Sequence, residues 1–308
     1  MLMGLGRIFR KKFKGKSATR YIKINYFRDT FKVPRWGYDK PPHELLHPVI
    51  AKNRADYQRL LKRLRPYGES FLRISKEEDK QKPHEPYLNN SWLPIFDSFS
   101  LYALLSVFNP PTFMEVGSGN STKFARRAIK DNKLKTRIIS IDPEPRAEID
   151  SICDEVIRRP VEEVEPEFFE RLKEGDFLFI DNSHRCFMNS DVTAVFIDIV
   201  PRLKGGVIIQ FHDIFLPADY PPRFGKRFYS EQYLLAAYLL SGGDMFADII
   251  LPNNFIINDP ELNAVVSPLF MDERLRGVEG GGSSFWVIKG PAESQRAFGL
   301  SPEENAGF

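Results

Sequence analysis

The chain has 308 residues, of which 42% are hydrophobic and 28% are charged, so it can bury a core in one enlarged domain or two average ones and is not a disordered chain. The net charge is +3, but the charged residues are unevenly distributed along the chain. The first 20 residues hold seven cations and no acid, which leaves a net charge of −4 on the other 288 residues. The main part of the chain is therefore not a basic nucleic-acid-binding protein. The chain has only two cysteines, which excludes a disulfide scaffold and a thiolate zinc site. No stretch reaches the roughly 20 apolar residues of a membrane-spanning helix. We therefore expect a reduced, cytoplasmic protein.

The first 16 residues interleave cations with apolar residues such as Leu5, Ile8 and Phe13. These charges interrupt the continuous apolar core that a cleaved signal peptide needs. Two interpretations remain open for residues 1–16. The segment is either a helix that makes weak contact with an anionic membrane surface or a solvated tail, and its glycines at positions 4, 6 and 15 favour the tail.

The residues up to about position 90 are predicted to form a basic tail and a helical or extended N-terminal extension. Apolar residues recur at helical spacing in two places, one within this extension and one just after it, and a charged loop separates the two. The expected pieces are an aromatic and proline-rich arm or lid over 21–50, a helical pattern over 48–72, a charged loop over 76–86 and a helix over 92–108 that Pro110 and Pro111 end.

After Pro111, short apolar runs rich in β-branched and aromatic residues alternate with helical patterns. Such an alternation is typical of a parallel sheet that is covered by helices on both faces. We therefore predict an α/β fold, with the main domain over 91–290 and a C-terminal tail over 291–308. The predicted strands are 113–116, 137–141, 155–157 (the weakest), 177–180, 207–211, 246–251 and 285–288, and the predicted helices are 123–129, 166–173, 191–203 and 232–240.

Parallel sheets bind ligands at the carboxyl ends of their strands, so the residues that follow each strand are candidates for a site. The first strand runs into the sequence EVGSGNST, residues 115–122. Gly117 and Gly119 allow a tight turn and a close approach of a ligand to the backbone. Thr122 stands where a dinucleotide-binding fingerprint has its third glycine, and Glu115 is better placed for a cationic ligand than for a phosphate. A plain strand–helix turn is the alternative interpretation.

The second strand ends at Asp142, which lies 23 residues beyond Gly119. A carboxylate at this place accepts hydrogen bonds from ribose hydroxyls, although an Asp in a loop before a proline also forms turns. Together, the glycine turn and Asp142 indicate a nucleoside ligand with a cationic extension that is not a phosphate. S-adenosylmethionine (SAM) has this composition.

With these motifs the chain resembles the class I SAM-dependent methyltransferases, in particular a branch of bacterial small-molecule and sugar O-methyltransferases with an Asp-x-x-His motif after the fourth strand. The resemblance spans about residues 90–290 and is carried by FMEVGSGNS, IISIDP, FLFIDNSHRCFMNSDV, GGVIIQFHDIFLPADYPP and YSEQYLLAAYLL. It implies a Rossmann-like, seven-stranded, mostly parallel sheet whose last strand is antiparallel, and a SAM-dependent methyltransferase domain over 91–290. The residues that we expect to hold SAM are Glu115, Gly117, Ser118, Gly119, Asn120, Ser121, Asp142 and Asp181.

The resemblance also implies a reactive end, because the fourth and fifth strands are neighbours in the family fold. Asp181 and His184 follow the fourth strand, and His212 and Asp213 follow the fifth, so these side chains should converge. An alcohol that accepts a methyl group must lose its proton. His184, with an ordinary pKa of about 6.5, is the predicted general base, and Asp181 and Asp213 are the other predicted catalytic residues.

Two hypotheses remain open for the acids at this end. In the first, Asp181, His212 and Asp213 bind Mg²⁺ or another divalent cation, as acids at these strand ends do in related metal-dependent O-methyltransferases. His212 stands where those enzymes carry an oxygen ligand, which favours an ion that tolerates nitrogen ligands or no ion at all. In the second, no metal binds, and Asp213 orients His184 or His212.

The proline-rich loop over 215–228 is predicted to cover the active site. Within it, Asp219, Tyr220 and Arg223 either contact a hydroxylated acceptor or serve packing and turn formation.

The sequence as a whole predicts a SAM-dependent methyltransferase that acts on a small polar acceptor, with a hydroxyl of a sugar or secondary metabolite as the preferred target. No nucleic-acid partner is expected, and a homo-oligomer stays open. Two alternatives come from other classes of protein. One is a dinucleotide-dependent oxidoreductase, and the other is a non-catalytic protein that keeps the methyltransferase fold.

Overall fold

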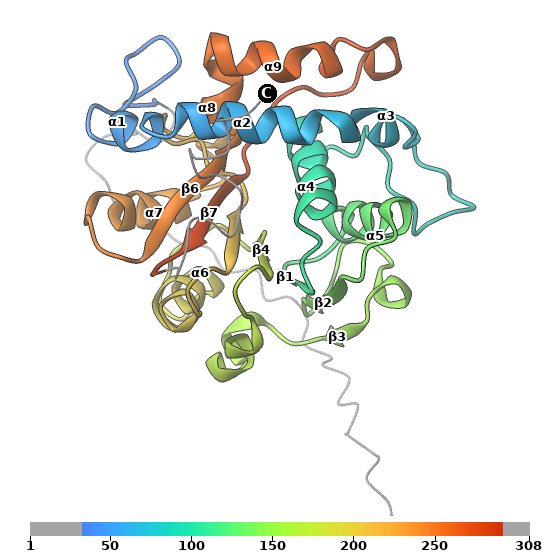
Figure 1. Cartoon of the computed structure of the whole chain (residues 1–308). Coiled ribbons are helices and arrows are strands. Elements are labelled where there is room, and N and C mark those ends of the chain that lie inside the picture. Colours follow the sequence, from blue (N-terminus) through green and yellow to red (C-terminus); the bar gives the residue numbers. More distant parts are fainter. Residues whose placement is uncertain (1–32, 292–308) are drawn as a thin grey trace, which may run out of the picture. The chain divides into compact units, whose positions relative to one another are not determined.

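A computed structural model describes residues 33–291, and at its centre lies a seven-stranded sheet in the order β3-β2-β1-β4-β5-β7-β6 (Figure 1). Neighbouring strands are parallel except that β7 is antiparallel to both β5 and β6. This arrangement confirms the predicted Rossmann-like, mostly parallel sheet with an antiparallel last strand. The strands are β1 (Thr112–Val116), β2 (Arg137–Ile141), β3 (Glu155–Ile157), β4 (Phe177–Ile180), β5 (Ile208–Phe211), β6 (Phe246–Pro252) and β7 (Phe285–Lys289).

The α-helices occur near the predicted positions and also between β6 and β7, where the sequence predicted none. The predicted stretch 48–72 is divided at two places: one helix ends at Ala51, and a later 3₁₀ turn over Arg65–Tyr67 contains Pro66, which has no N–H to donate. The α-helices are α1 (Leu46–Ala51), α2 (Arg54–Leu64), α3 (Gly68–Phe71), α4 (Ile95–Phe108), α5 (Asn120–Asn132), α6 (Asp191–Thr193), α7 (Glu231–Leu240), α8 (Asn253–Asn258) and α9 (Pro260–Phe270).

Two predicted helices take other helical forms. The stretch predicted over 191–203 begins as α6, continues as a π-helix over Ala194–Ile199 and ends in a 3₁₀ turn that contains Pro201, which has no N–H to donate. The stretch predicted over 166–173 is a 3₁₀-helix, as is common for a short connection of this kind.

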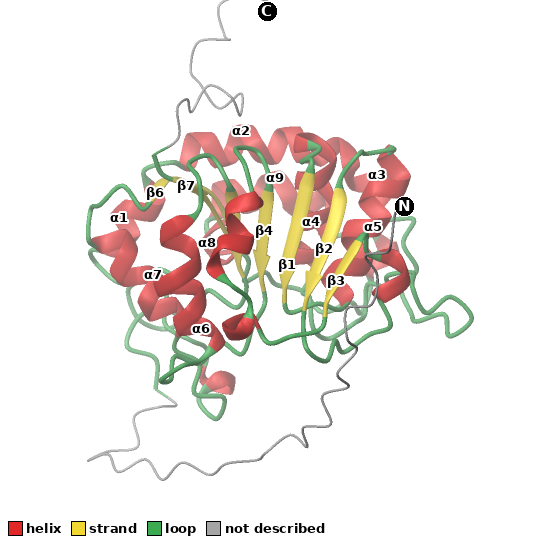
Figure 2. Ribbon diagram, turned by 90° about the horizontal axis from the view of Figure 1, so that it is seen from below, coloured by secondary structure: helices red, strands yellow, loops and turns green. Residues whose placement is uncertain are grey.

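The sheet is buried because its central strands are almost continuously apolar. Every residue of β4 and β5 is buried, and the one polar side chain among them, Gln210, donates a hydrogen bond to the Ser284 hydroxyl at 2.9 Å. Helices α4 and α5 lie on one side of the sheet, and α6 and α7 lie on the other (Figure 2). The prediction of helices on both faces is therefore confirmed.

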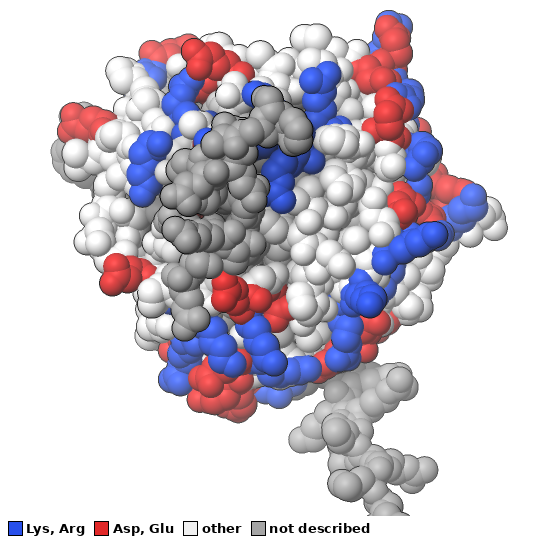
Figure 3. All heavy atoms as spheres, viewed as in Figure 1, with Lys and Arg blue, Asp and Glu red and all other residues white. Residues whose placement is uncertain are grey.

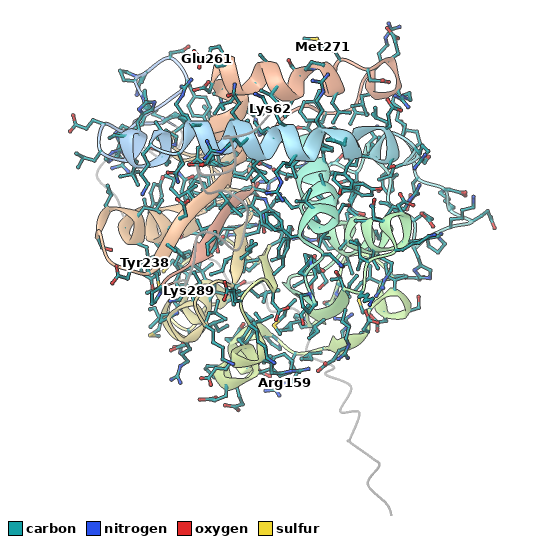
Figure 4. All side chains as sticks on the ribbon, viewed as in Figure 1. Lys62, Arg159, Tyr238, Glu261, Met271 and Lys289 are labelled. Carbon is teal, nitrogen blue, oxygen red and sulfur yellow. The ribbon has the colours of Figure 1, made fainter. Side chains whose placement is uncertain are left out.

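The helices before residue 90 pack into the same hydrophobic core as the sheet. Tyr57 and Leu61 on α2 have no solvent exposure and belong to the cluster of buried residues that contains the strands. Helix α2 packs against α4 and α9, while Lys62, Glu261 and Met271 on the outer sides of α2 and α9 are exposed (Figure 4). The division of the chain at residue 90 stays a prediction.

Charges of both signs are interspersed on the face seen in Figure 3. Among the described residues, exposed ion pairs include Arg274 with Glu69 and Arg276 with Glu273. Exposed ion pairs contribute little to stability, so the fold depends mainly on the core.

Within residues 33–291, no helix is both long and apolar enough to cross a membrane. Cys153 and Cys186 are both free thiols. The predictions for residues 1–16 and for the C-terminal tail from residue 292 onward concern parts of the chain outside the described residues.

Candidate active site

The turn after β1 lies directly against the end of β4. Gly117 has a φ of +79°, and a Cβ atom built on it would lie 1.8 Å from the backbone oxygen of Asp181. Only glycine fits such a position, because other residues would be strained by the left-handed φ and blocked by the neighbouring carbonyl. At Gly119, by contrast, no atom lies within 4 Å of the corresponding Cβ position, so the backbone there faces open space.

Thr122 ties the glycine turn to the strand that precedes it. Its hydroxyl oxygen accepts a hydrogen bond from the Gly119 N–H at 3.1 Å and donates one to a carboxylate oxygen of Glu115. Glu115 has no solvent exposure, and burial raises its pKa to about 7. Thr122 therefore has a structural task at the position where a dinucleotide fingerprint carries glycine.

Asp142 lies at the carboxyl end of β2, beside the same turn. One of its carboxylate oxygens accepts a hydrogen bond from the Ser118 N–H and the other accepts one from the Glu144 N–H, each at 2.7 Å. The carboxylate is thus fixed by two backbone donors and retains further lone pairs for a ligand.

A cavity of about 620 Å³ opens over the glycine turn and Asp142. Its size is within the usual range for a site that binds a small molecule or cofactor. Glu115 is the one predicted SAM-binding residue that does not line this cavity, since its side chain is buried beneath the turn. The predicted residues that do line it are Gly117, Ser118, Gly119, Asn120, Ser121, Asp142 and Asp181.

His184 is held between three carboxylates. Its Nδ1 lies 2.8 Å from Oε2 of Glu231, and its Nε2 lies 3.2 Å from Oδ1 of Asp181 and 3.7 Å from Oδ2 of Asp213. Its backbone carbonyl also accepts a hydrogen bond from the Ser230 N–H at 2.8 Å, which joins the loop after β4 to the start of α7. The imidazole is therefore fixed from both sides of the site.

The backbones of His184 and Asp213 both adopt the left-handed conformation, with φ values of +59° and +54°. Such conformations cost about 1–3 kcal/mol at a residue that is not glycine and cluster at functional sites. Strain at two neighbouring charged residues is a reason to assign them a function rather than a purely structural role.

His212 lies beside this group at the end of β5. Its Nδ1 is 3.5 Å from Oδ1 of Asp181 and 3.8 Å from Oδ1 of Asp213, and its Nε2 is 3.4 Å from Oδ2 of Asp97. Although only 2% of the residue is exposed, neither ring nitrogen has a hydrogen-bond partner. A buried imidazole with two unsatisfied nitrogens is costly unless a ligand completes it.

The carboxylates and imidazoles of this site shift one another's pKa values. Burial by itself lowers the pKa of His184, but the hydrogen bonds to Asp181 and Glu231 outweigh burial and raise the pKa to about 10. In the same way, Asp181 and Asp213 raise the pKa of His212. Burial raises the pKa of Asp181, but both imidazoles outweigh it and hold the pKa well below its usual range. At neutral pH the arrangement is therefore one of imidazolium rings between carboxylates.

The cluster also has the composition of a metal site. One ligand atom each from Asp181, His184 and His212 lies within 4.8 Å of the others. Asp213, which belonged to the predicted metal set, lies beside both imidazoles at 3.7 and 3.8 Å. The unsatisfied nitrogens of His212 make these residues fit a divalent cation, and two imidazoles with one carboxylate suit a nitrogen-tolerant ion better than Mg²⁺.

A second, smaller cavity of about 120 Å³ lies over the two imidazoles. Asp181, His184, His212 and Asp213 all line it. The residues that line both this cavity and the larger one are Trp92, Leu93, Arg146 and Asp181.

Asp97 and Glu231 belong to this site but were not predicted from the sequence. Asp97 on α4 has no solvent exposure and accepts hydrogen bonds from the backbone N–H groups of Ser283 and Ser284 and from the side chain of Asn253. Neither acid gave a signal in the sequence, because each stands in the first turn of its helix, where an acid is ordinary.

Two residues of the loop over 215–228 are engaged in packing. Asp219 is 6% exposed and accepts hydrogen bonds from the Arg35 N–H and the Tyr233 hydroxyl. Tyr220 packs in a small aromatic cluster with Phe215 and Phe224. Of the three residues predicted to contact an acceptor or to pack, Arg223 is the one that lines the smaller cavity.

Comparison with known proteins finds a likeness over part of the chain. No curated protein sequence matches it. The structure of the plantazolicin methyltransferase BpumL in complex with SAH has 14% identity, with 77% of this chain and 98% of that one covered and a TM-score of 0.37. A SAM-dependent methyltransferase from Archaeoglobus fulgidus has 13% identity, with 62% of this chain and 91% of that one covered and a TM-score of 0.31. Structural likeness at these TM-scores does not indicate function.

The family model described as "Methyltransferase domain" matches residues 114–214. This stretch runs from within β1 to just past β5, and it contains the glycine turn, Asp142, Asp181, His184, His212 and Asp213. The match supports a methyltransferase domain over the stretch that holds the glycine turn and the ends of β4 and β5, while most residues that line the smaller cavity lie outside it.

Proposed function

We propose that the protein is a SAM-dependent methyltransferase that methylates a hydroxyl group of a small polar acceptor such as a sugar or secondary metabolite. One observation carries this proposal: Asp181 lines both cavities, one above the glycine turn and the other above the two imidazoles. Methyl transfer needs a donor and an acceptor that meet in a fixed geometry, and two cavities that share a wall meet this need.

In this proposal the larger cavity takes SAM. Asp142 accepts hydrogen bonds from the ribose hydroxyls, and the backbone at Gly119 leaves room for the ligand. Glu115 does not contact SAM in this proposal. Its carboxylate accepts a hydrogen bond from the Thr122 hydroxyl and so stabilises the glycine turn beneath the ligand. When bound, SAM supplies a methyl group on a sulfonium, which is an activated electrophile.

The chain's own residues then have to remove the proton of the acceptor hydroxyl. His184 is the proposed acceptor of this proton, through the Nε2 atom that faces Asp181 and Asp213. Because the three carboxylates favour its protonated form, His184 has to release a proton before it can act as a base. Asp213 lies 3.7 Å from the same nitrogen, beyond direct hydrogen-bond distance, so it can receive that proton only through an intervening water.

A divalent cation offers a second way to activate the hydroxyl. Asp181, His184 and His212 would hold it, and both imidazoles would have to be neutral in order to bind. A bound cation lowers the pKa of a coordinated hydroxyl, and Asp213 would then remain as the nearby proton acceptor.

Calorimetry separates the proposal from its rivals. We expect S-adenosylhomocysteine (SAH) to bind the full chain and NAD to bind no better than adenosine. Replacing Asp142 with Ala should weaken SAH binding by about 1–3 kcal/mol, because the ribose hydroxyls lose their acceptor. Exclusive binding of NAD would favour the oxidoreductase, and an Asp142→Ala protein with unchanged SAH affinity would refute the assigned site.

Binding alone does not distinguish an enzyme from a non-catalytic protein of the same fold. SAM with a labelled methyl group should therefore be incubated with a panel of sugars and hydroxylated metabolites. Transfer of label that disappears in His184→Ala supports the proposal. SAH binding without any transfer across the panel would favour a non-catalytic role.

A further inference from the structure

Three arginines line the smaller cavity together with the residues proposed for proton removal. Arg223 and Arg227 come from the loop before α7, and Arg146 comes from the loop after β2. Two of the three carboxylates in this lining, Asp181 and Asp213, face the imidazoles of the site. Glu279 is the remaining carboxylate among the described residues of the lining.

These arginines differ from most others in the described part of the chain. Ten of the other described arginines make ion pairs, for example Arg126 with Asp154 and Arg171 with Glu155, whereas some exposed ones such as Arg65 and Arg73 make none. Arg146, Arg223 and Arg227 form no ion pair with a carboxylate within residues 33–291. All three arginines are exposed, so solvent screens their mutual repulsion, and their guanidinium groups are open to an anion.

Aromatic rings hold the guanidinium groups in place. The guanidinium carbons of Arg223 and Arg227 lie 5.3 and 4.6 Å from the centre of the same ring, that of Phe224. Arg227 also donates a hydrogen bond to the Tyr229 hydroxyl at 3.1 Å. Phe224 is only 7% exposed, so it is a fixed platform. A guanidinium beside a ring keeps N–H donors free for a planar or tetrahedral oxyanion.

We propose that the methyl acceptor carries a carboxylate or phosphate group, which Arg223 and Arg227 bind while the hydroxyl to be methylated lies at Asp181 and His184. The polar groups of Asn89, Ser91 and Ser283 in the same wall suit the other hydroxyls of such a molecule. This inference rests on the proposed function, since it names the acceptor class for the same site.

The test uses the full chain saturated with SAH, with inorganic phosphate and ¹³C-labelled acetate as separate probes. Binding is followed by the linewidths of the ³¹P and ¹³C signals at constant ionic strength. We expect saturable binding of at least one probe, and the tighter probe identifies the group as phosphate or carboxylate. The double variant Arg223→Gln/Arg227→Gln should weaken that binding about tenfold or more, because charge-assisted hydrogen bonds are lost.

The matched control is Arg65→Gln/Arg73→Gln, which removes two exposed arginines that line neither cavity. It should bind the probes like the wild type. Thermal unfolding of both double variants checks that they are folded. The inference is overturned if neither probe binds saturably or if the Arg223→Gln/Arg227→Gln protein binds as tightly as the control. Failure of SAH to bind refutes the proposed function instead, so the two failures are distinguishable.

Discussion

The Nδ1 atom of His184 lies 2.8 Å from Oε2 of Glu231, a carboxylate without solvent exposure at the start of α7. This contact links residues that are 47 positions apart in the sequence and directs Nε2 of the same ring toward Asp181 and Asp213. Burial raises the pKa of Glu231 and outweighs the facing imidazole, which lowers it. The carboxylate of Glu231 and the imidazolium of His184 each stabilise the opposite charge of the other group.

Replacement of Glu231 with Gln should lower methyl transfer about 10–100-fold, because His184 loses the charge that orients its ring. The pKa of His184, followed by NMR of its ring proton, should fall from about 10, since one of the groups that raise it is gone. Glu261→Gln on the exposed side of α9 serves as the control and should change neither quantity. An unchanged pKa in Glu231→Gln would show that this contact does not govern the imidazole.

Gly117→Ala should lower the free energy of unfolding by about 2 kcal/mol or more. The added methyl group would collide with the carbonyl of Asp181, and the left-handed backbone disfavours any residue other than glycine. Gly280→Ala, where no atom lies within 4 Å of the new Cβ, should stay within about 0.5 kcal/mol of the wild type. Equal stability of the two variants in denaturant titrations would contradict the close contact between the turn and β4.

Stability should fall as the pH rises from about 5 to above 7, in part because of Glu115. Its pKa is raised from 4.5 in the unfolded chain to about 7 in the fold, so the folded state binds the proton more tightly. The stability that this proton provides is present below pH 4.5 and is lost as the pH passes through 7, by at most about 3 kcal/mol.

Glu115→Gln is the measurement for this effect, since a neutral amide keeps an acceptor for Thr122 and cannot titrate. The variant should lose that part of the pH dependence in urea unfolding between pH 5 and about 8. Glu69→Gln, a change at an exposed carboxyl, should leave the slope intact. If Glu115→Gln keeps the wild-type slope, then Glu115 does not titrate in this range.

Chelation should separate the two ways of activating the acceptor. If a cation binds at Asp181, His184 and His212, EDTA should abolish methyl transfer, and Mn²⁺ or Zn²⁺ should restore it better than Mg²⁺ because two of the ligands are nitrogens. Elemental analysis should find about one equivalent of metal in the wild type and much less in Asp181→Asn, whereas the exposed control Asp79→Asn should retain it. Full activity in EDTA, with no bound metal, would leave His184 and the carboxylates to act alone.

The sequence was sufficient to predict the sheet and the meeting of the candidate side chains at one of its edges. Short apolar runs between helical patterns have few stable arrangements other than a parallel sheet covered on both faces, and this sheet is present with an antiparallel β7. Asp181, His212 and Asp213 were expected to converge because the fourth and fifth strands are neighbours in the family that the sequence resembles. Asp181 and Asp213 lie 3.5 and 3.8 Å from Nδ1 of His212.

The partners of the two imidazoles were decided only by the tertiary structure. Asp97 reaches His212 from a helix that precedes the sheet, and Glu231 reaches His184 from a helix that follows β5. Arg223 and Arg227 line the smaller cavity because the aromatic ring of Phe224 fixes their loop. Local periodicity predicts which segments become helices and strands, but it carries no information on which residues of distant segments meet. Those contacts depend on how the helices and loops pack against the sheet, where burial then sets the charge of each group.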